Sequence, residues 1–103
     1  MKYEIKYNTT NPTKEYKINE LEELFFDAVY EEIGNGITLT RMSDGTLDVS
    51  YHSYQIGRIK LQGRKYKMQI LKGLYGVKWI DGDINDFIPH IKDWKKYIKK
   101  GMI

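Results

Sequence analysis

The chain has 103 residues, a net charge of +3, 30% charged residues and no cysteine. This length predicts one domain, residues 1–103, and the lack of cysteine excludes disulfides, thiolate metal sites and cysteine nucleophiles. Because no apolar run approaches the roughly 20 residues of a membrane helix, we expect a cytoplasmic protein that does not contact membranes.

Charge is distributed unevenly along the chain. Residues 1–36 hold four lysines and eight acidic residues, a net −4. Residues 37–103 hold thirteen lysines and arginines and six aspartates, a net +7. This asymmetry predicts an acidic side and a basic side on the folded protein.

The first part of the chain predicts a strand followed by a helix. Apolar and charged residues alternate from Lys2 to Tyr7, which is typical of a half-buried strand. Asn19 is in the N-cap position of a helix over Ile18–Ile33, with Glu22 in the capping-box position and glycine 34 at its end. The apolar residues expected on the inner stripe of this helix include Ile18, Leu21, Leu24, Phe25, Ala28 and Val29.

Two β-hairpins are predicted in the middle of the chain. Asp44-Gly45 lies between two alternating segments, 37–42 and 46–51, which is a strong hairpin signal. A longer hairpin is expected over Tyr54–Leu71, with its turn at Gln62-Gly63. These segments supply most of the strands of the predicted sheet.

Gly57 is an unusual residue for the interior of the longer hairpin. Glycine within a strand indicates a bulge or a close approach by another group. A bulge at this position allows Ile56 and Ile59 both to point into the core.

The last third of the chain predicts a short strand and a second helix. Residues 76–80 are expected to form the strand, and Asp83 to open the helix. Pro89 is expected to kink this helix, or to delay its start until about Phe87-Ile88.

The predicted fold class is therefore α+β, with the order β-α-β-β-β-β-α. We expect an antiparallel sheet of four to five strands, with both helices on one face and the other face open. The residues expected in the core are Ile5, Leu21, Phe25, Val29, Leu39, Val49, Ile59, Met68, Ile70, Phe87, Ile91 and Trp94.

The sequence offers little support for catalysis. His52 and His90 are isolated, and the serines are not in a nucleophile-elbow pattern. The acidic segment 81–86 resembles the start of a calcium loop, but the twelfth position counted from Asp81 is Lys92, and helix capping explains the same residues. We expect no enzymatic activity, no cofactor and no metal site.

The basic residues of the long hairpin are the best functional signal. Phosphate neutralisation requires several cations on one surface, and strand alternation predicts that most of these lie on the open sheet face. An alternative explanation is that they keep this face soluble and prevent edge pairing. We expect a small non-enzymatic binding module with nucleic acid as the leading partner. The expected contact residues are Arg58, Lys60, Arg64, Lys65 and Lys67.

The alternative function is a protein-interaction module, such as a small inhibitor or accessory factor from a phage or mobile element. The acidic face of the first helix would engage a basic partner, or the uncovered edge of the sheet would pair with another strand. The helix residues expected to make this contact are Glu20, Glu23, Asp27 and Glu31.

Overall fold

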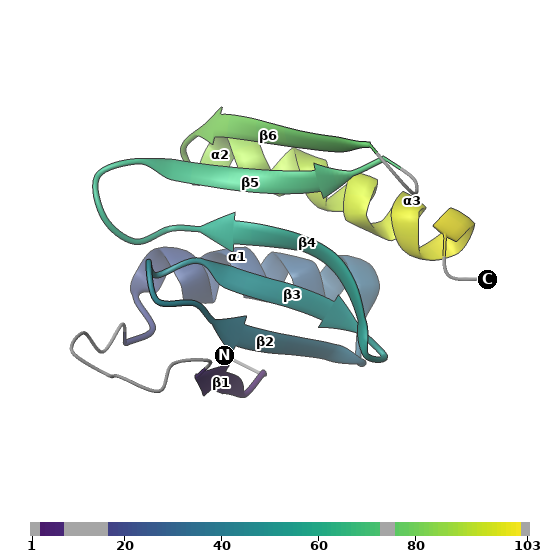
Figure 1. Ribbon diagram of the computed structural model, residues 1–103, viewed down its shortest axis with the longest axis horizontal. Helices are drawn as coiled ribbons and strands as arrows, with labels where there is room; N and C mark the ends of the chain where they lie inside the picture. The colour runs from purple at the N-terminus through teal and green to yellow at the C-terminus, as the bar shows by residue number, and fades with distance from the viewer. Residues whose placement is uncertain (1–2, 8–16, 73–75, 102–103) are drawn as a thin grey trace.

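A computed structural model describes residues 3–7, 17–72 and 76–101, which form a sheet with helices packed on one face (Figure 1). The strands are β1 (Ile5–Tyr7), β2 (Ile37–Arg41), β3 (Leu47–Tyr51), β4 (Tyr54–Lys60), β5 (Tyr66–Leu71) and β6 (Val77–Gly82). The helices are α1 (Glu20–Ile33), α2 (Ile84–Phe87), the 3₁₀ turn η1 (Ile88–His90) and α3 (Ile91–Gly101).

The six strands lie in the sheet in the order in which they occur in the chain. Strands β2 to β6 form an antiparallel meander, whereas β1 pairs with β2 in parallel. The prediction of a purely antiparallel sheet of four to five strands is therefore wrong in detail. The reason is the connection through α1, because a strand–helix–strand crossover returns the chain in the same direction.

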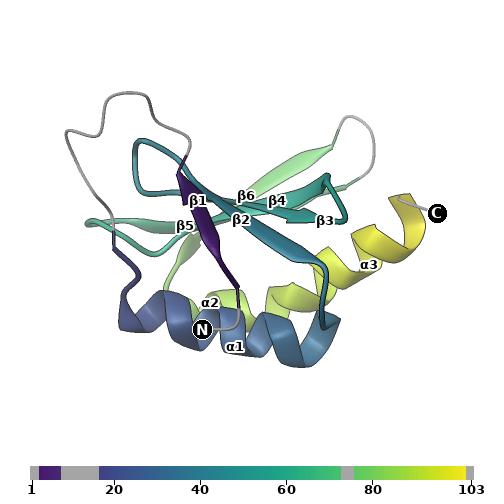
Figure 2. The same ribbon diagram turned by 90° about the horizontal axis from the view of Figure 1, so that it is seen from below.

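The two-layer α+β arrangement agrees with the predicted fold class. Figure 2 shows α1 and the α2–α3 segment on the same side of the sheet. Within the described ranges, no element covers the opposite side, which is called the open face below.

Helix α1 begins and ends where its capping residues predict. The Asn19 side chain accepts a hydrogen bond from the Glu22 backbone N–H at 2.8 Å, and Glu22 Oε1 accepts one from the Asn19 backbone at 3.2 Å. Gly34 follows the helix with φ of 88°, a conformation that costs glycine little. The capping-box prediction is confirmed.

The inner stripe of α1 differs from the predicted one. Leu24 is 58% exposed and Ile18 is 39% exposed, although both were expected on this stripe. Glu22 and Phe26 are buried instead. The helix is rotated so that Phe26 packs against Phe25 and against Tyr3, which lies in the segment just before β1.

The expected core agrees closely with the buried residues. Every expected core residue is buried except Ile5 and Leu21, which are half-buried and pack against the core cluster. Ile56 and Leu61 of the long hairpin are also fully buried. The helices and the sheet therefore share one core between their facing surfaces.

The bulge predicted at Gly57 is present. The register between β3 and β4 shifts between Val49 and Ser50, and Gly57 pairs with Val49 on one side of the shift. Both Ile56 and Ile59 are fully buried as a result. As expected for a bulge, the extra residue in β4 allows Ile56 and Ile59, which strict alternation would place on opposite faces, both to face the core.

Gly57 also permits the close approach of an aromatic side chain. Trp94 of α3 is fully buried and its indole N–H donates to the Gln69 carbonyl at 2.8 Å. A Cβ atom added at Gly57 would lie 2.4 Å from Trp94 Nε1 and 2.6 Å from the Gln69 carbonyl oxygen. Glycine is therefore the residue that lets α3 rest directly on the β4–β5 backbone.

We expect Gly57→Ala to destabilise the protein by about 1–3 kcal/mol, because the added methyl group overlaps with Trp94 and with the β5 backbone. The direction of the stability change is informative, because in an unobstructed strand alanine is more stable than glycine by roughly 0.5–1 kcal/mol. Urea unfolding of the variant and the wild type measures the difference. A variant that is more stable than wild type would contradict the close packing of Trp94.

The carboxyl-terminal helical segment is interrupted at Pro89, as predicted. Asp83 caps α2 through a capping box with Asp86, so the acidic segment has the capping role expected for it. The chain then passes through the 3₁₀ turn that contains Pro89 before α3 begins at Ile91. The proline thus separates one short turn of helix from the longer α3.

Glu22 and Arg41 form a buried ion pair that the sequence did not reveal. Their side chains are 0% and 2% exposed, and two contacts of 2.5 and 3.0 Å join the guanidinium to the carboxylate. Gln62 donates to Glu22 at 2.9 Å, and the Gly45 carbonyl accepts from Arg41 at 3.0 Å. This network connects α1, β2 and the turns of both hairpins.

Candidate binding surface

The open face of the sheet has regular cross-strand rows. One row crosses the sheet from β2 to β6 through Thr40, Asp48, Arg58, Gln69 and Trp79, which are paired in register from strand to strand. This face is turned toward the viewer in Figure 1. Polar and charged side chains therefore occupy most of the surface that the helices leave uncovered.

The structure brings three of the five predicted cations together on this face. Arg58 and Lys60 lie on β4, and Lys67 lies directly opposite Lys60 on β5. Arg64 and Lys65 are exposed in the turn between these strands. Arg58, Lys60 and Lys67 are thus neighbours on the open face, whereas Arg64 and Lys65 lie beyond them at the turn of the same hairpin.

Carboxylates lie beside these cations. Arg58 Nε is 3.2 Å from Asp48 Oδ1, and Asp81 is the register partner of Lys67. Asp83 lines a shallow hollow together with Arg64. The positive charge that the sequence predicted for the open face is therefore opposed by negative charge from β3, β6 and the start of α2.

Asp44 adds a further carboxylate next to Lys60 and Lys67. Burial alone would raise the pKa of Asp44, but a hydrogen bond of 3.0 Å from the Thr46 backbone N–H, together with the positive charges of the two lysines, lowers the pKa below its ordinary value. The stabilisation that follows from this shift is present at neutral pH. It is fully present above the ordinary aspartate pKa, about 4, and is lost as the pH falls below this value through the lowered pKa of Asp44 in the folded protein.

We expect an NMR titration of the Asp44 carboxyl carbon to give a midpoint below the ordinary aspartate value. Lys60→Gln/Lys67→Gln should move this midpoint upward, because it removes the two positive charges near Asp44. Lys92→Gln/Lys99→Gln, which removes the same charge from α3, is the control and should leave the midpoint unchanged. Equal midpoints in all three proteins would show that the open-face lysines do not act on Asp44.

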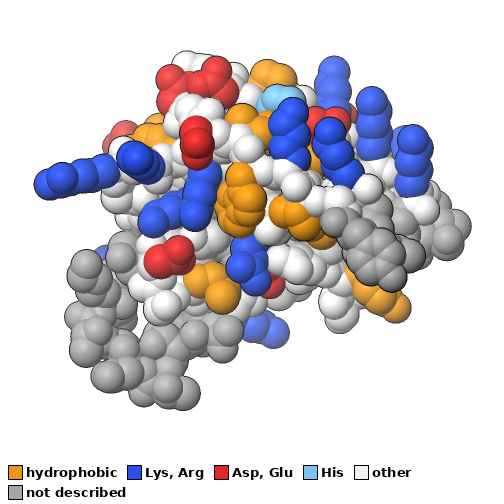
Figure 3. All heavy atoms as spheres, turned by 45° about the horizontal axis from the view of Figure 1, so that its top comes forward, with side chains coloured by type: hydrophobic (Ala, Val, Ile, Leu, Met, Phe, Trp, Pro, Cys, Tyr) orange, Lys and Arg blue, Asp and Glu red, His pale blue; other side chains and the backbone are white. Residues whose placement is uncertain are grey.

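Trp79 is an exposed aromatic residue on the edge strand β6, beside these charged side chains. Its side chain is 42% exposed, and Lys67 Nζ lies 4.7 Å from its ring centroid. Trp79, Arg58, Lys67 and Asp44 line a shallow hollow of about 280 Å³. Figure 3 shows acidic, basic and apolar side chains interspersed on this side of the molecule.

Trp79 was not among the predicted site residues, although the sequence held a usable signal. Trp79 alternates with Ile80, and Ile80 packs against the core. In a strand, the residue next to a core residue faces the opposite side. If the sequence had predicted β6 over its full length, strand alternation would also have predicted that Trp79 is exposed on the open face, on the same side of the strand as Val77.

The acidic residues of the alternative prediction lie together on α1. All four are exposed and spaced at three or four residues along one side of the helix. Leu24, 58% exposed, lies among them. The residues of this acidic stripe are Glu20, Glu23, Asp27 and Glu31.

In the part of the chain that the structure describes, no group of three or more histidine or acidic side chains is arranged to hold a metal ion. His90 is paired with Asp93 at 2.7 Å, and the His52 ring meets the Tyr51 ring edge to face. Among the same residues, no helix is long and apolar enough to span a membrane. Comparisons with protein-family models, with curated proteins and with solved structures found no match to this chain.

Proposed function

We propose that this protein is a small non-enzymatic binding module that binds another protein through the open face, with Trp79 at the centre of the contact. The observation that carries this proposal is an exposed tryptophan held against Lys67 within a surface of balanced charge. Tryptophan and arginine are enriched in the energetically dominant positions of protein interfaces. The cytoplasm is the proposed compartment, since the chain contains no cysteine.

The balance of charge favours a protein partner over a phosphate backbone. A nucleic-acid site needs an excess of cations, because each neutralised phosphate contributes to affinity. Asp44, Asp48 and Asp81 lie next to the cations of the open face and would repel phosphates. A protein surface with charges of both signs, in contrast, can pair with each of these groups.

Nucleic acid is the second candidate, and the position of Trp79 favours it. An exposed aromatic ring beside lysine is the combination that single-stranded nucleic-acid sites use for stacking and charge neutralisation. The residues of this candidate site are Arg58, Lys60, Arg64, Lys65 and Lys67, with Trp79 as the stacking platform.

Capture of partners from nuclease-treated lysate tests the proposal when wild type is compared with Trp79→Ala. A partner bound through the open face should be retained by wild type and lost with Trp79→Ala. The control is Glu20→Lys/Glu23→Lys, which changes the acidic stripe and should leave capture unchanged. Loss with the acidic-stripe variant and retention with Trp79→Ala would move the interface to α1.

Titration of labelled single- and double-stranded oligonucleotides at low and moderate salt tests the second candidate. The protein-partner proposal predicts that Arg58→Glu/Lys60→Glu/Lys67→Glu does not change oligonucleotide affinity. Phosphate contacts on the open face would instead give a steep salt dependence and a large loss of affinity in this triple variant.

A further inference from the structure

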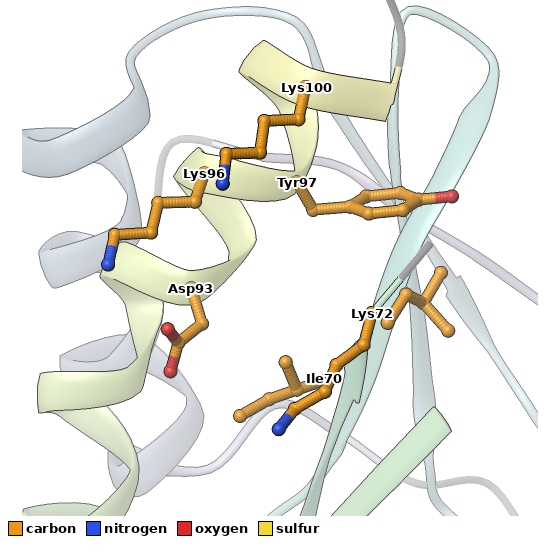
Figure 4. Close-up of a pocket in the computed structure, with 7 residues that line it drawn as sticks. Ile70, Lys72, Asp93, Lys96, Tyr97 and Lys100 are labelled. Atoms are coloured by element: carbon orange, nitrogen blue, oxygen red, sulfur yellow. The ribbon is translucent and has the colours of Figure 1, made fainter. Parts of the chain in front are cut away.

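A cleft between α3 and the end of β5 differs from the open face in charge and in shape. It has a volume of about 390 Å³, within the range of roughly 300–1,000 Å³ typical of small-molecule sites. Figure 4 shows that the side chains lining the cleft extend from α3 on one side and from the end of β5 on the other. The lining residues, called the α3–β5 cleft below, include Ile70, Lys72, Asp93, Lys96, Tyr97 and Lys100.

The rim of the α3–β5 cleft has an excess of positive charge. Lys72, Lys96 and Lys100 supply three ammonium groups, against the single carboxylate of Asp93. That carboxylate is already in contact with His90 Nδ1 at 2.7 Å. The cleft therefore has an excess of cations, which the open face lacks. Figure 3 shows several basic side chains over α3.

The interior of the same cleft is apolar. Ile70 is 4% exposed, and the half-buried Tyr97 packs against the core while its ring borders the cleft. An aromatic ring fixed in this way offers a flat face for stacking, and lysines at the rim are suited to phosphate. The arrangement combines an aromatic wall with lysine side chains around one small hollow.

We propose that the α3–β5 cleft binds a nucleotide unit. Its phosphate contacts Lys72, Lys96 and Lys100, and its base packs against Tyr97. The same chemistry is present in a free mononucleotide and in one residue of a single-stranded nucleic acid. The site is separate from the open face, so this proposal does not depend on the protein-partner proposal.

The test is an NMR titration of the labelled protein with adenosine monophosphate and, separately, with a thymidine decamer. Resonances of residues 70–72 and 93–100 should shift, and Lys96→Gln/Lys100→Gln should weaken binding by about tenfold or more. Lys92→Gln/Lys99→Gln removes the same charge from α3 outside the cleft and should have a much smaller effect. Tyr97→Leu should weaken binding of adenosine monophosphate while leaving binding of inorganic phosphate unchanged.

The two ligands distinguish the two sources of the nucleotide. Tighter binding of the decamer than of the mononucleotide indicates a nucleic-acid strand, and comparable binding indicates a free nucleotide. Trp79→Ala should bind both ligands as wild type does. The proposal is overturned if neither ligand shifts the cleft resonances, or if both pairs of lysine substitutions weaken binding equally, since the effect would then be one of general charge.

Discussion

Replacing Trp94 with alanine is expected to lower the free energy of unfolding by about 3–5 kcal/mol. Trp94 is fully buried and meets Phe25 of α1 edge to face, with ring centroids 5.5 Å apart. Its indole N–H also donates to the backbone of β5. The residue therefore joins both helices to the sheet, and chemical denaturation of Trp94→Ala measures the loss.

Trp94→Phe separates packing from hydrogen bonding at this position, and Trp79→Ala is the control at an exposed position. Trp94→Phe keeps an aromatic ring but leaves the Gln69 carbonyl without its donor, and should cost about 1–3 kcal/mol. Trp79→Ala removes the same side chain from the exposed face and should cost about 1 kcal/mol or less. Similar losses for Trp94→Ala and Trp79→Ala would mean that α3 is not packed on the β4–β5 backbone.

Glu22→Ala is expected to destabilise the protein by about 3–5 kcal/mol, because it leaves the guanidinium of Arg41 buried without its counter-charge. The alanine also removes an acceptor for the Asn19 backbone and for Gln62. The same denaturation experiment gives the loss. Glu23→Ala, the neighbouring exposed carboxylate, is the matched control and should change stability by about 0.5 kcal/mol or less.

The double variant Glu22→Leu/Arg41→Met tests the cause of this effect. Replacing both charges with apolar side chains removes the unpaired buried charge, so the double variant should recover most of the stability lost in Glu22→Ala. If the loss of stability in the double variant equals the sum of the losses in Glu22→Leu and Arg41→Met, the two charges do not act as a pair.

Local signals in the sequence accounted for most of the fold. Asn19 with Glu22 predicted the start of α1, Asp44-Gly45 predicted the first hairpin, and Gly57 predicted a bulge. Each of these features depends on residues that are close together in the chain. The parallel pairing of β1 and the burial of Glu22 against Arg41 depend on contacts between distant elements, which periodicity does not reveal.

The candidate surfaces were less predictable for the same reason. Strand alternation correctly placed Arg58, Lys60 and Lys67 on one face. Their neighbours Asp48 and Asp81 come from other strands, so the balance of charge emerged only with the register. The α3–β5 cleft likewise forms between two elements, whereas the lysines of the last helix alone are typical of a solvated helix face.

Site-specific crosslinking tests most directly whether the open face is the binding surface. A photo-crosslinking amino acid would replace Val77, which is 54% exposed on β6 next to Trp79, or Asp27 on the exposed side of α1. After irradiation in cells and nuclease treatment, our account predicts a discrete protein adduct from position 77, absent when Trp79→Ala is added, and none from position 27. Adducts formed only from position 27, or adducts from position 77 that nuclease removes, would contradict it.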